Sequence, residues 1–130
     1  MKRLLSHWNL PAWLWGLFIL VMTSYPKIEI PQTGFMPMDK LLHAGVYFIF
    51  AVLVSRALSH YQNRELGQHI LVSTLITVGF ALFDEIHQIF IPGRHGDIAD
   101  AAADIVGILI AQVVFVKVIV PIVNSQSNNT

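Results

Sequence analysis

Residues 69–91 read HILVSTLITVGFALFDEIHQIFI, an apolar run in which Asp84 and Glu85 carry the only formal charges when histidine is neutral. A helix needs ~20 mainly apolar residues to cross the hydrocarbon core of a bilayer. Similar runs occupy residues 10–25, 40–58 and 98–123. The sequence therefore predicts an all-α integral membrane bundle of four transmembrane helices, forming a single domain over residues 1–130 with a polar, frayed tail at 124–130.

Composition supports a membrane protein and excludes several other classes. The chain is 55% hydrophobic and 12% charged, and its mean hydropathy is +0.61, far from the balance of a soluble domain. The formal net charge is zero, so nucleic acid is not an expected partner. Cysteine is absent, which excludes disulfides, thiolate metal sites and cysteine nucleophiles. The sequence gives no reason to expect a cofactor, and it leaves the oligomeric state open.

The orientation follows from the basic residues near the span ends. No small-residue cleavage pattern follows the first apolar run, so we interpret this run as a retained span rather than a signal peptide. Five basic residues then lie on the side of the N-terminus and three on the opposite side, which predicts cytoplasmic N- and C-termini. The five are Lys2, Arg3, Arg56, Arg64 and Lys117, and the three are Lys27, Lys40 and Arg94.

Most acidic residues fall at span ends that this topology places together on the outer side. Ionisable groups in a span are costly unless they are paired, hydrated or neutralised, so we predict that these groups face one cleft between helices. Residues three or four positions apart share a helix face, which groups Asp39 with His43, Glu85 with Gln88, and Asp100 with Asp104. Six of the eight acidic residues belong to this set: Asp39, Asp84, Glu85, Asp97, Asp100 and Asp104.

Arg94 is the cation nearest to these acids in sequence. A guanidinium forms bidentate hydrogen bonds with carboxylates, so Arg94 is expected to bridge to Glu85 or to reach Asp100. Lys40 and His43 are the other candidates for neutralising the acids. Two interpretations of Glu85, Gln88, Arg94 and Asp100 remain open: they bind a polar ligand, or they form a network that fixes the bundle.

The spacing of the acidic and histidine residues does not predict a metal site. Asp84 and His87 have the i, i+3 spacing that some metal sites use, but no matching second motif exists. Asp39 and His43 form a proton-transfer pair, half of a metal site or, as the favoured interpretation, a hydrogen-bonded structural pair. Asp97 is expected to cap the fourth span.

The remaining marked residues are expected to be structural or interfacial. Gly107 and Ala111, four residues apart, are expected to let two helices pack closely. The tryptophans are expected at the membrane interface or facing lipid. Four histidines are expected to be solvated or interfacial: His7, His60, His69 and His95.

Four motifs together resemble the VanZ-like membrane proteins: DKLLH at 39–43, DEIHQ at 84–88, PGR at 92–94, and Asp100 followed by Asp104 and Gly107. The resemblance runs from about residue 39 to residue 111. Asp104 departs from it, because an asparagine is expected there in many relatives. The family's pattern residues correspond to Asp39, Lys40, His43, Glu85, Gln88, Arg94, Asp100 and Gly107.

The resemblance implies a small multi-pass protein of the bacterial cytoplasmic membrane, in a family named for a member associated with low-level teicoplanin resistance. It places the chain in the cell envelope without giving a mechanism. We predict a protein that engages a polar envelope component, such as a lipid-linked wall precursor, or a glycopeptide, through the acidic cleft. The alternatives are an enzyme acting on a lipid-linked or phosphate-bearing substrate and a small proton-coupled transporter.

Overall fold

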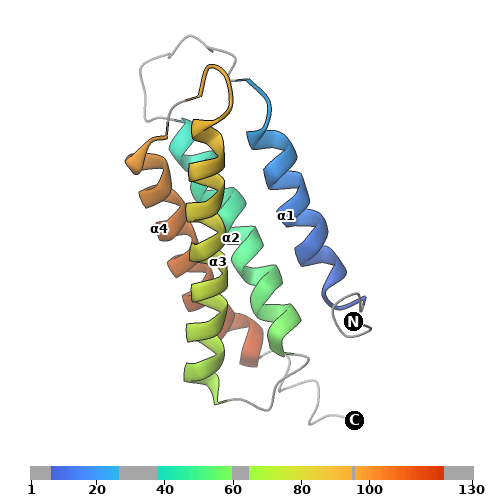
Figure 1. Ribbon diagram of the computed structural model, residues 1–130. Coiled ribbons are helices and arrows are strands. Elements are labelled where there is room, and N and C mark those ends of the chain that lie inside the picture. Colours follow the sequence, from blue (N-terminus) through green and yellow to red (C-terminus); the bar gives the residue numbers. More distant parts are fainter. Residues whose placement is uncertain (1–6, 27–37, 60–64, 95, 122–130) are drawn as a thin grey trace.

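Four helices run alternately up and down in the computed structural model, which describes residues 7–26, 38–59, 65–94 and 96–121 (Figure 1). The last of them continues into a π-helical turn. The elements are α1 (Leu10–Thr23), α2 (Met38–Ser59), α3 (Leu66–Ile89), α4 (Ile98–Val114) and η1 (Phe115–Ile119). The all-helical prediction is confirmed, while the predicted tail at 124–130 lies outside the described residues.

Three of these helices are long and apolar enough to cross a membrane, and α1 is shorter. The three are α2, α3 and the continuous stretch Ile98–Ile119. The 14 residues of α1 give a length of about 21 Å, less than the ~30 Å of a hydrocarbon core. Its crossing of the membrane, expected from the sequence, therefore stays a prediction.

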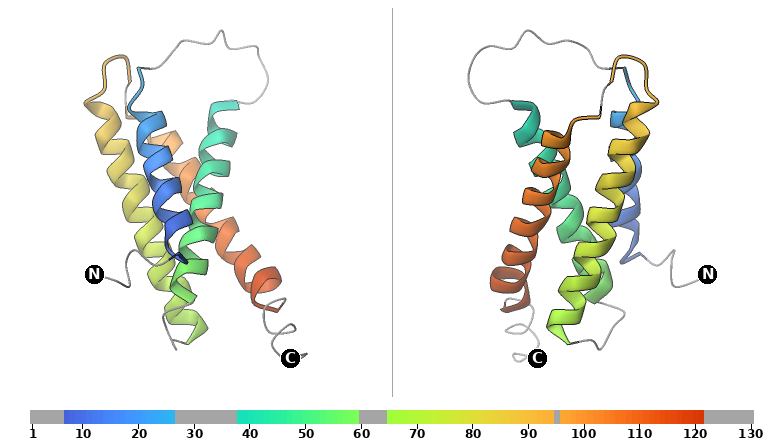
Figure 2. Two further views of the ribbon diagram at one scale, coloured as in Figure 1. Left: turned by 90° about the vertical axis from the view of Figure 1, so that its right-hand side faces the viewer. Right: turned by 60° about the vertical axis from the view of Figure 1, so that its left-hand side comes forward.

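Helix α2 lies at the centre of the bundle, in contact with α1, α3 and α4 (Figure 2). Trp15 of α1 is not simply a lipid-facing residue, because its indole nitrogen donates to the carbonyl oxygen of Val46 on α2 at 3.0 Å. The apolar core is small and lies along α2. It consists of Ile19, Tyr47, Phe50, Ala51, Val54, Ala81, Ile108 and Ala111.

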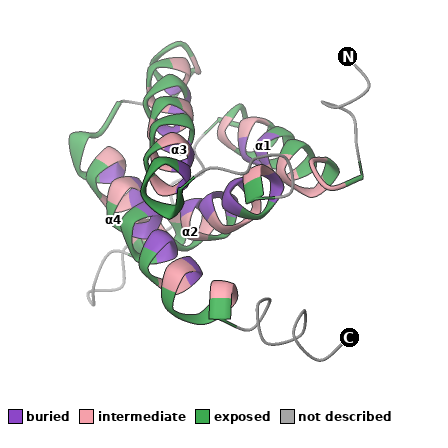
Figure 3. Cartoon of the chain, turned by 90° about the horizontal axis from the view of Figure 1, so that it is seen from below, coloured by how far each residue is buried: buried purple, intermediate pink, exposed green. Residues whose placement is uncertain are grey.

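Buried positions face the bundle axis and exposed positions face outward (Figure 3). Many of the outward side chains are large and apolar, among them Leu75, Phe83 and Val113. A soluble monomer rarely exposes so large an apolar surface, whereas a bilayer is the natural solvent for it. The distribution of side chains therefore supports contact with lipid around the bundle.

Helix α4 approaches α2 closely at Gly107, one of the two residues at which the sequence predicts close packing. Gly107 of α4 lies against the backbone of Ala44 on α2, and a Cβ atom on Gly107 would come within 2.9 Å of the Ala44 Cα. Ala111, one turn further, is fully buried. Small residues let two helix backbones approach closely, which is a common way to join helices in lipid. This contact brings the polar first turns of α2 and α4 side by side.

Candidate functional site

The C-terminal ends of α1 and α3 and the N-terminal ends of α2 and α4 meet at one end of the bundle, the upper end in Figure 1. We call this region the polar end. All of the predicted cluster residues lie there, on three different helices or just beyond one of them. They are Asp39, Lys40, His43, Glu85, Gln88, Arg94, Asp100 and Asp104.

Asp84 is the centre of a buried hydrogen-bond network at the polar end. Its side chain, only 1% exposed, accepts a hydrogen bond from the Thr23 hydroxyl at 2.6 Å and one from the Tyr47 hydroxyl at 3.1 Å. The amide nitrogen of Gln88 donates to the same carboxylate at 3.2 Å. Asp84 thus joins α1, α2 and α3, and its cost in an apolar setting is offset by three donors.

Arg94 extends this network to the end of α1. Its Nη1 donates to the Gln88 side-chain oxygen at 2.9 Å, and its Nε donates to the Tyr25 carbonyl oxygen at 2.9 Å. Nη2 donates to the Met22 carbonyl oxygen at 3.3 Å. A cation stabilises the C-terminal carbonyls of a helix, which form the negative end of its dipole. We call Asp84, Thr23, Tyr47, Gln88 and Arg94 the inner network.

These contacts correct the expected role of Arg94. The sequence predicts a bridge to Glu85 or Asp100, but in the described structure the guanidinium donates to Gln88 and to the end of α1 instead. Gly93, with a positive φ of 78°, turns the chain after α3, and Arg94 follows directly. Two of its nitrogens hold the end of α1 and the third donates to Gln88 of α3, so Arg94 contributes to the structure of the polar end rather than to its open surface.

A second group of charged residues lies between the first turns of α2 and α4. The Lys40 ammonium contacts the Asp97 carboxylate at 3.1 Å and also pairs with Asp100. The side chains of Lys40 and Asp97 are 30% and 51% exposed, whereas Asp100 is 8% exposed. We call this group the outer cluster. It consists of Asp39, Lys40, His43, Asp97, Asp100 and Asp104.

His43 is held between two aspartates of α4. Its Nδ1 lies 3.0 Å from an Asp104 oxygen, and its Nε2 lies 3.8 Å from an Asp100 oxygen. The Asp104 side chain is 2% exposed, so the contact with His43 is made in the interior. The sequence paired His43 with Asp39 on the same helix face, but the hydrogen bond is made to Asp104 on another helix.

Asp39, His43 and Asp100 come close enough to hold a metal ion. One potential ligand atom from each residue lies within 4.8 Å of the other two. Asp84 and His87 have a spacing that some metal sites use, but Asp84 Oδ1 lies 4.0 Å from His87 Nδ1, and Asp84 already accepts three hydrogen bonds. Among the described residues, the group whose geometry suits a metal ion therefore lies on α2 and α4 and not on α3.

Glu85 joins the end of α3 to the start of α4. Its carboxylate accepts a hydrogen bond from the Asp97 backbone nitrogen at 2.5 Å. The predicted cap is confirmed, because the Asp97 side chain accepts from the Ala99 backbone nitrogen at 2.8 Å. These two bonds satisfy backbone donors at the polar end and fix the loop that leads into α4.

Sequence reasoning missed a second buried polar group, which lies away from the polar end. The hydroxyls of Ser55 and Ser73 are 2.6 Å apart, and the Gln112 side chain lies 3.1 Å from each of them. His69, expected at an interface, is 5% exposed and stacks on Phe115. Serine and glutamine are common in loops, so their spacing alone did not mark them as a network between helices.

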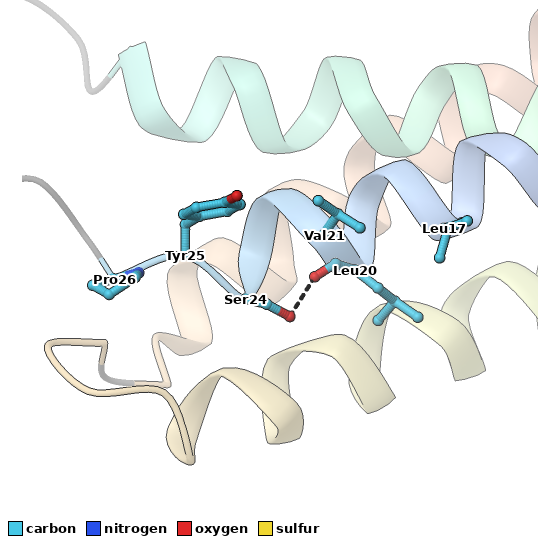
Figure 4. Close-up of a pocket in the computed structure, with 6 residues that line it drawn as sticks. All are labelled: Leu17, Leu20, Val21, Ser24, Tyr25 and Pro26. Atoms are coloured by element: carbon cyan, nitrogen blue, oxygen red, sulfur yellow. Dashed lines mark hydrogen bonds between the residues drawn. The ribbon is translucent and has the colours of Figure 1, made fainter.

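A hollow of about 530 Å³ opens along α1 toward the polar end (Figure 4). Leu17, Leu20 and Val21 line it along the helix, and Ser24, Tyr25 and Pro26 line it just beyond the end of the helix. The Tyr25 carbonyl oxygen is one of the acceptors of Arg94, so the hollow adjoins the inner network. The lining residues are Leu17, Leu20, Val21, Ser24, Tyr25 and Pro26.

The fold and the polar end define a small multi-pass helical membrane protein whose ionisable side chains gather at one end of the bundle. The chain belongs to the VanZ/LLP1 family, whose model matches residues 5–121. The predicted resemblance is thereby confirmed over more of the chain than its motifs covered. Comparisons with curated proteins and with solved structures found no match.

Proposed function

We propose that the polar end binds the polar part of a cell-envelope component, either a lipid-linked wall precursor or a glycopeptide antibiotic, at the outer face of the bacterial cytoplasmic membrane. The observation that carries this proposal is the partial exposure of the outer cluster. Lys40 and Asp97 remain accessible at the end of the bundle, while the helices behind them are joined by the buried inner network. A rigid base with an accessible charged surface suits a binding site.

The charge of the outer cluster indicates the chemistry of its ligand. The outer cluster contains four aspartates and one lysine, and the Lys40 ammonium pairs with two of the aspartates, so hydrogen-bond acceptors dominate. Sugar hydroxyls, peptide amides and ammonium groups are donors that suit such a surface, and wall precursors and glycopeptides carry groups of these kinds. The hollow beside α1 also supports a lipid-linked ligand, because an acyl or prenyl chain can pack against its apolar side chains (Figure 4).

The function is tested by glycopeptide susceptibility in a host whose wall is accessible to the drug. We expect the wild type to raise the inhibitory concentration of teicoplanin, and Asp39→Asn to abolish the protection at equal membrane abundance. Glu65→Gln makes the same carboxyl-to-amide change at an exposed position at the opposite end of the bundle and should keep the protection. Equal protection by Asp39→Asn and wild type would contradict a role for the outer cluster. No protection by the wild type would contradict the proposal that this protein acts on glycopeptides.

The orientation is tested with single cysteines in this cysteine-free chain. Ser24 and Ser59 are exposed, lie at opposite ends of the bundle and donate to carbonyls of their own helices, so they form a matched pair. If the polar end faces outward and the termini are cytoplasmic, Ser24→Cys reacts with an impermeant thiol reagent in intact cells and Ser59→Cys does not. The reverse pattern would turn the polar end toward the cytoplasm.

A further inference from the structure

The contacts of His43 follow the pattern of a metal-binding histidine. An ionised Asp104 accepts hydrogen bonds and cannot donate them, so the 3.0 Å contact requires that His43 Nδ1 carries the proton. The neutral ring then presents the lone pair of Nε2 on its other side, toward Asp100. Histidines that bind metals are commonly oriented in this way by a carboxylate on the second ring nitrogen.

From this geometry we propose that Asp39, His43 and Asp100 bind a divalent transition-metal ion, with Asp104 as the positioning residue behind His43. The separation of 3.8 Å between His43 Nε2 and Asp100 Oδ2 is too long for a hydrogen bond. Two ligand atoms that bind Zn²⁺ tetrahedrally lie roughly 3.4 Å apart, given metal–ligand distances of ~2.1 Å. This pair reaches the metal-binding separation by a contraction of a few tenths of an ångström, and the Asp39 oxygen, within 4.8 Å of the other two atoms, by a shift of at most about 1.4 Å.

The donor set favours Zn²⁺ or a similar transition metal over Mg²⁺ or Ca²⁺. One imidazole nitrogen and two carboxylate oxygens suit Zn²⁺, whereas Mg²⁺ and Ca²⁺ prefer oxygen ligands alone. Three protein ligands leave at least one coordination position for water or for a ligand, as in open zinc sites. Asp39 and His43 come from one turn of α2, and Asp100 comes from the first turn of α4.

Charge balance supports a bound cation. Among the described contacts, Asp100 pairs with Lys40, and both Asp100 and Asp104 lie beside the His43 ring. Asp100 and Asp104 are nearly buried, where unbalanced charge is costly. A divalent ion between His43 Nε2 and Asp100 Oδ2 adds positive charge next to these carboxylates. Lys40 pairs with Oδ1 of Asp100, so the Oδ2 atom facing His43 stays available to the ion.

A metal at this position also widens the range of ligands for the polar end, and this step rests on the proposed function. An acidic surface repels phosphate, but a divalent ion with an open coordination position attracts it. The metal site therefore predicts that the polar end binds a phosphate or carboxylate group of its envelope ligand through the ion. The donor-rich remainder of that ligand contacts the surrounding aspartates.

The experiment measures Zn²⁺ binding to the full chain, purified in detergent without a histidine tag and stripped with a chelator. Competition with a chromophoric chelator gives Kd and stoichiometry for the wild type, His43→Gln, Asp39→Asn and Asp104→Asn. His87→Gln is the matched control, because His87 lies at the same end but outside the three-residue group. Circular dichroism verifies the helix content of each variant, and Mg²⁺ is titrated in parallel.

We expect one Zn²⁺ per chain, a Kd raised at least about 100-fold by His43→Gln, and a rise of about 10-fold in Asp104→Asn. His87→Gln should bind as the wild type does, and Mg²⁺ should not compete. No binding by the wild type, or an equal loss in His87→Gln, would overturn the metal site. If His43→Gln does not fold, Asp39→Asn, which changes a half-buried ligand, provides the test: it should also raise the Kd for Zn²⁺, and an unchanged Kd would overturn the metal site. Teicoplanin protection without Zn²⁺ binding would overturn the metal site and leave the proposed function intact. Zn²⁺ binding without teicoplanin protection would support the metal site and contradict the proposed function.

Discussion

The inner network and the outer cluster lie at the same end of the bundle and are built around the same residue type, aspartate. In the inner network, Asp84 receives three hydrogen bonds from uncharged donors on three helices. In the outer cluster, Asp97 and Asp100 share one lysine, and His43 lies between two carboxylates. A buried carboxylate whose acceptors are filled by fixed donors joins helices. Carboxylates grouped around a histidine, beside the partly exposed Lys40 and Asp97, instead form a surface that a ligand can reach.

The largest effect is expected from removing the carboxylate of the inner network. Asp84→Ala leaves the hydroxyls of Thr23 and Tyr47 and the amide of Gln88 without their acceptor. At about 1 kcal/mol for each orphaned donor, the free energy of unfolding should fall by roughly 3 kcal/mol. Tyr47→Phe removes one of the three bonds and should cost about 1 kcal/mol. Unfolding in detergent, followed by circular dichroism, measures both, and a neutral Asp84→Ala would show that the network does not hold the bundle.

The next largest effect is expected where the helices of the outer cluster touch. Gly107→Ala places a methyl group against the Ala44 backbone, next to His43, and so pushes α4 away from α2. Such overpacking should cost about 2 kcal/mol and lengthen the contact between His43 and Asp104. Gly79→Ala is the control, because nothing lies within 4 Å of a Cβ atom there. Equal stability of the two variants would argue against the tight approach of α2 and α4.

A smaller effect is expected from Arg94. Arg94→Gln removes the donors that hold the Tyr25 and Met22 carbonyls, so α1 should loosen at its C-terminal end. We expect a loss of about 1 kcal/mol and faster hydrogen exchange in the last turn of α1, with α2 and α4 unchanged. Lys117→Gln, an exposed change on η1, controls for the loss of a positive charge. Exchange that rises equally in all helices would contradict a local role for Arg94.

The smallest effect on stability is expected in the outer cluster. Lys40→Gln breaks pairs with Asp97 and Asp100. The lysine is partly exposed in both pairs, and the glutamine amide can still donate to Asp100, so the cost should stay below about 1 kcal/mol. The same unfolding assay measures this cost. A fall in the free energy of unfolding as large as that of Asp84→Ala would show that the outer cluster is structural, as the inner network is, and would contradict a separate binding surface.

Much of the fold was predictable from the sequence, because the length of an apolar run and its punctuation by proline and glycine depend only on local residues. The resemblance of DKLLH and DEIHQ to family motifs also identified the residues of the polar end. Partners across helices were not predictable. Arg94 binds the end of α1 rather than an acid, and His43 binds Asp104 rather than Asp39, because both outcomes depend on how far apart the helices pack.

Asp84 shows why the inner network was underestimated. Its position near the end of α3 suggested an acid that needed a cation, whereas its actual partners are hydroxyl and amide groups that carry no charge. Thr23 and Tyr47 look like ordinary residues of apolar helices when they are read in sequence. Only the three-dimensional arrangement brings their hydroxyls to one carboxylate.

The most direct test compares Asp84→Asn with Asp39→Asn, the same chemical change in the two regions, by the free energy of unfolding in detergent. The account predicts that Asp84→Asn lowers this free energy by about 1 kcal/mol or more, because the amide replaces one acceptor oxygen with a donor that faces other donors. Asp39→Asn should leave it unchanged within about 0.5 kcal/mol. Equal losses, or a larger loss in Asp39→Asn, would contradict the division of the polar end into a structural network and an open site.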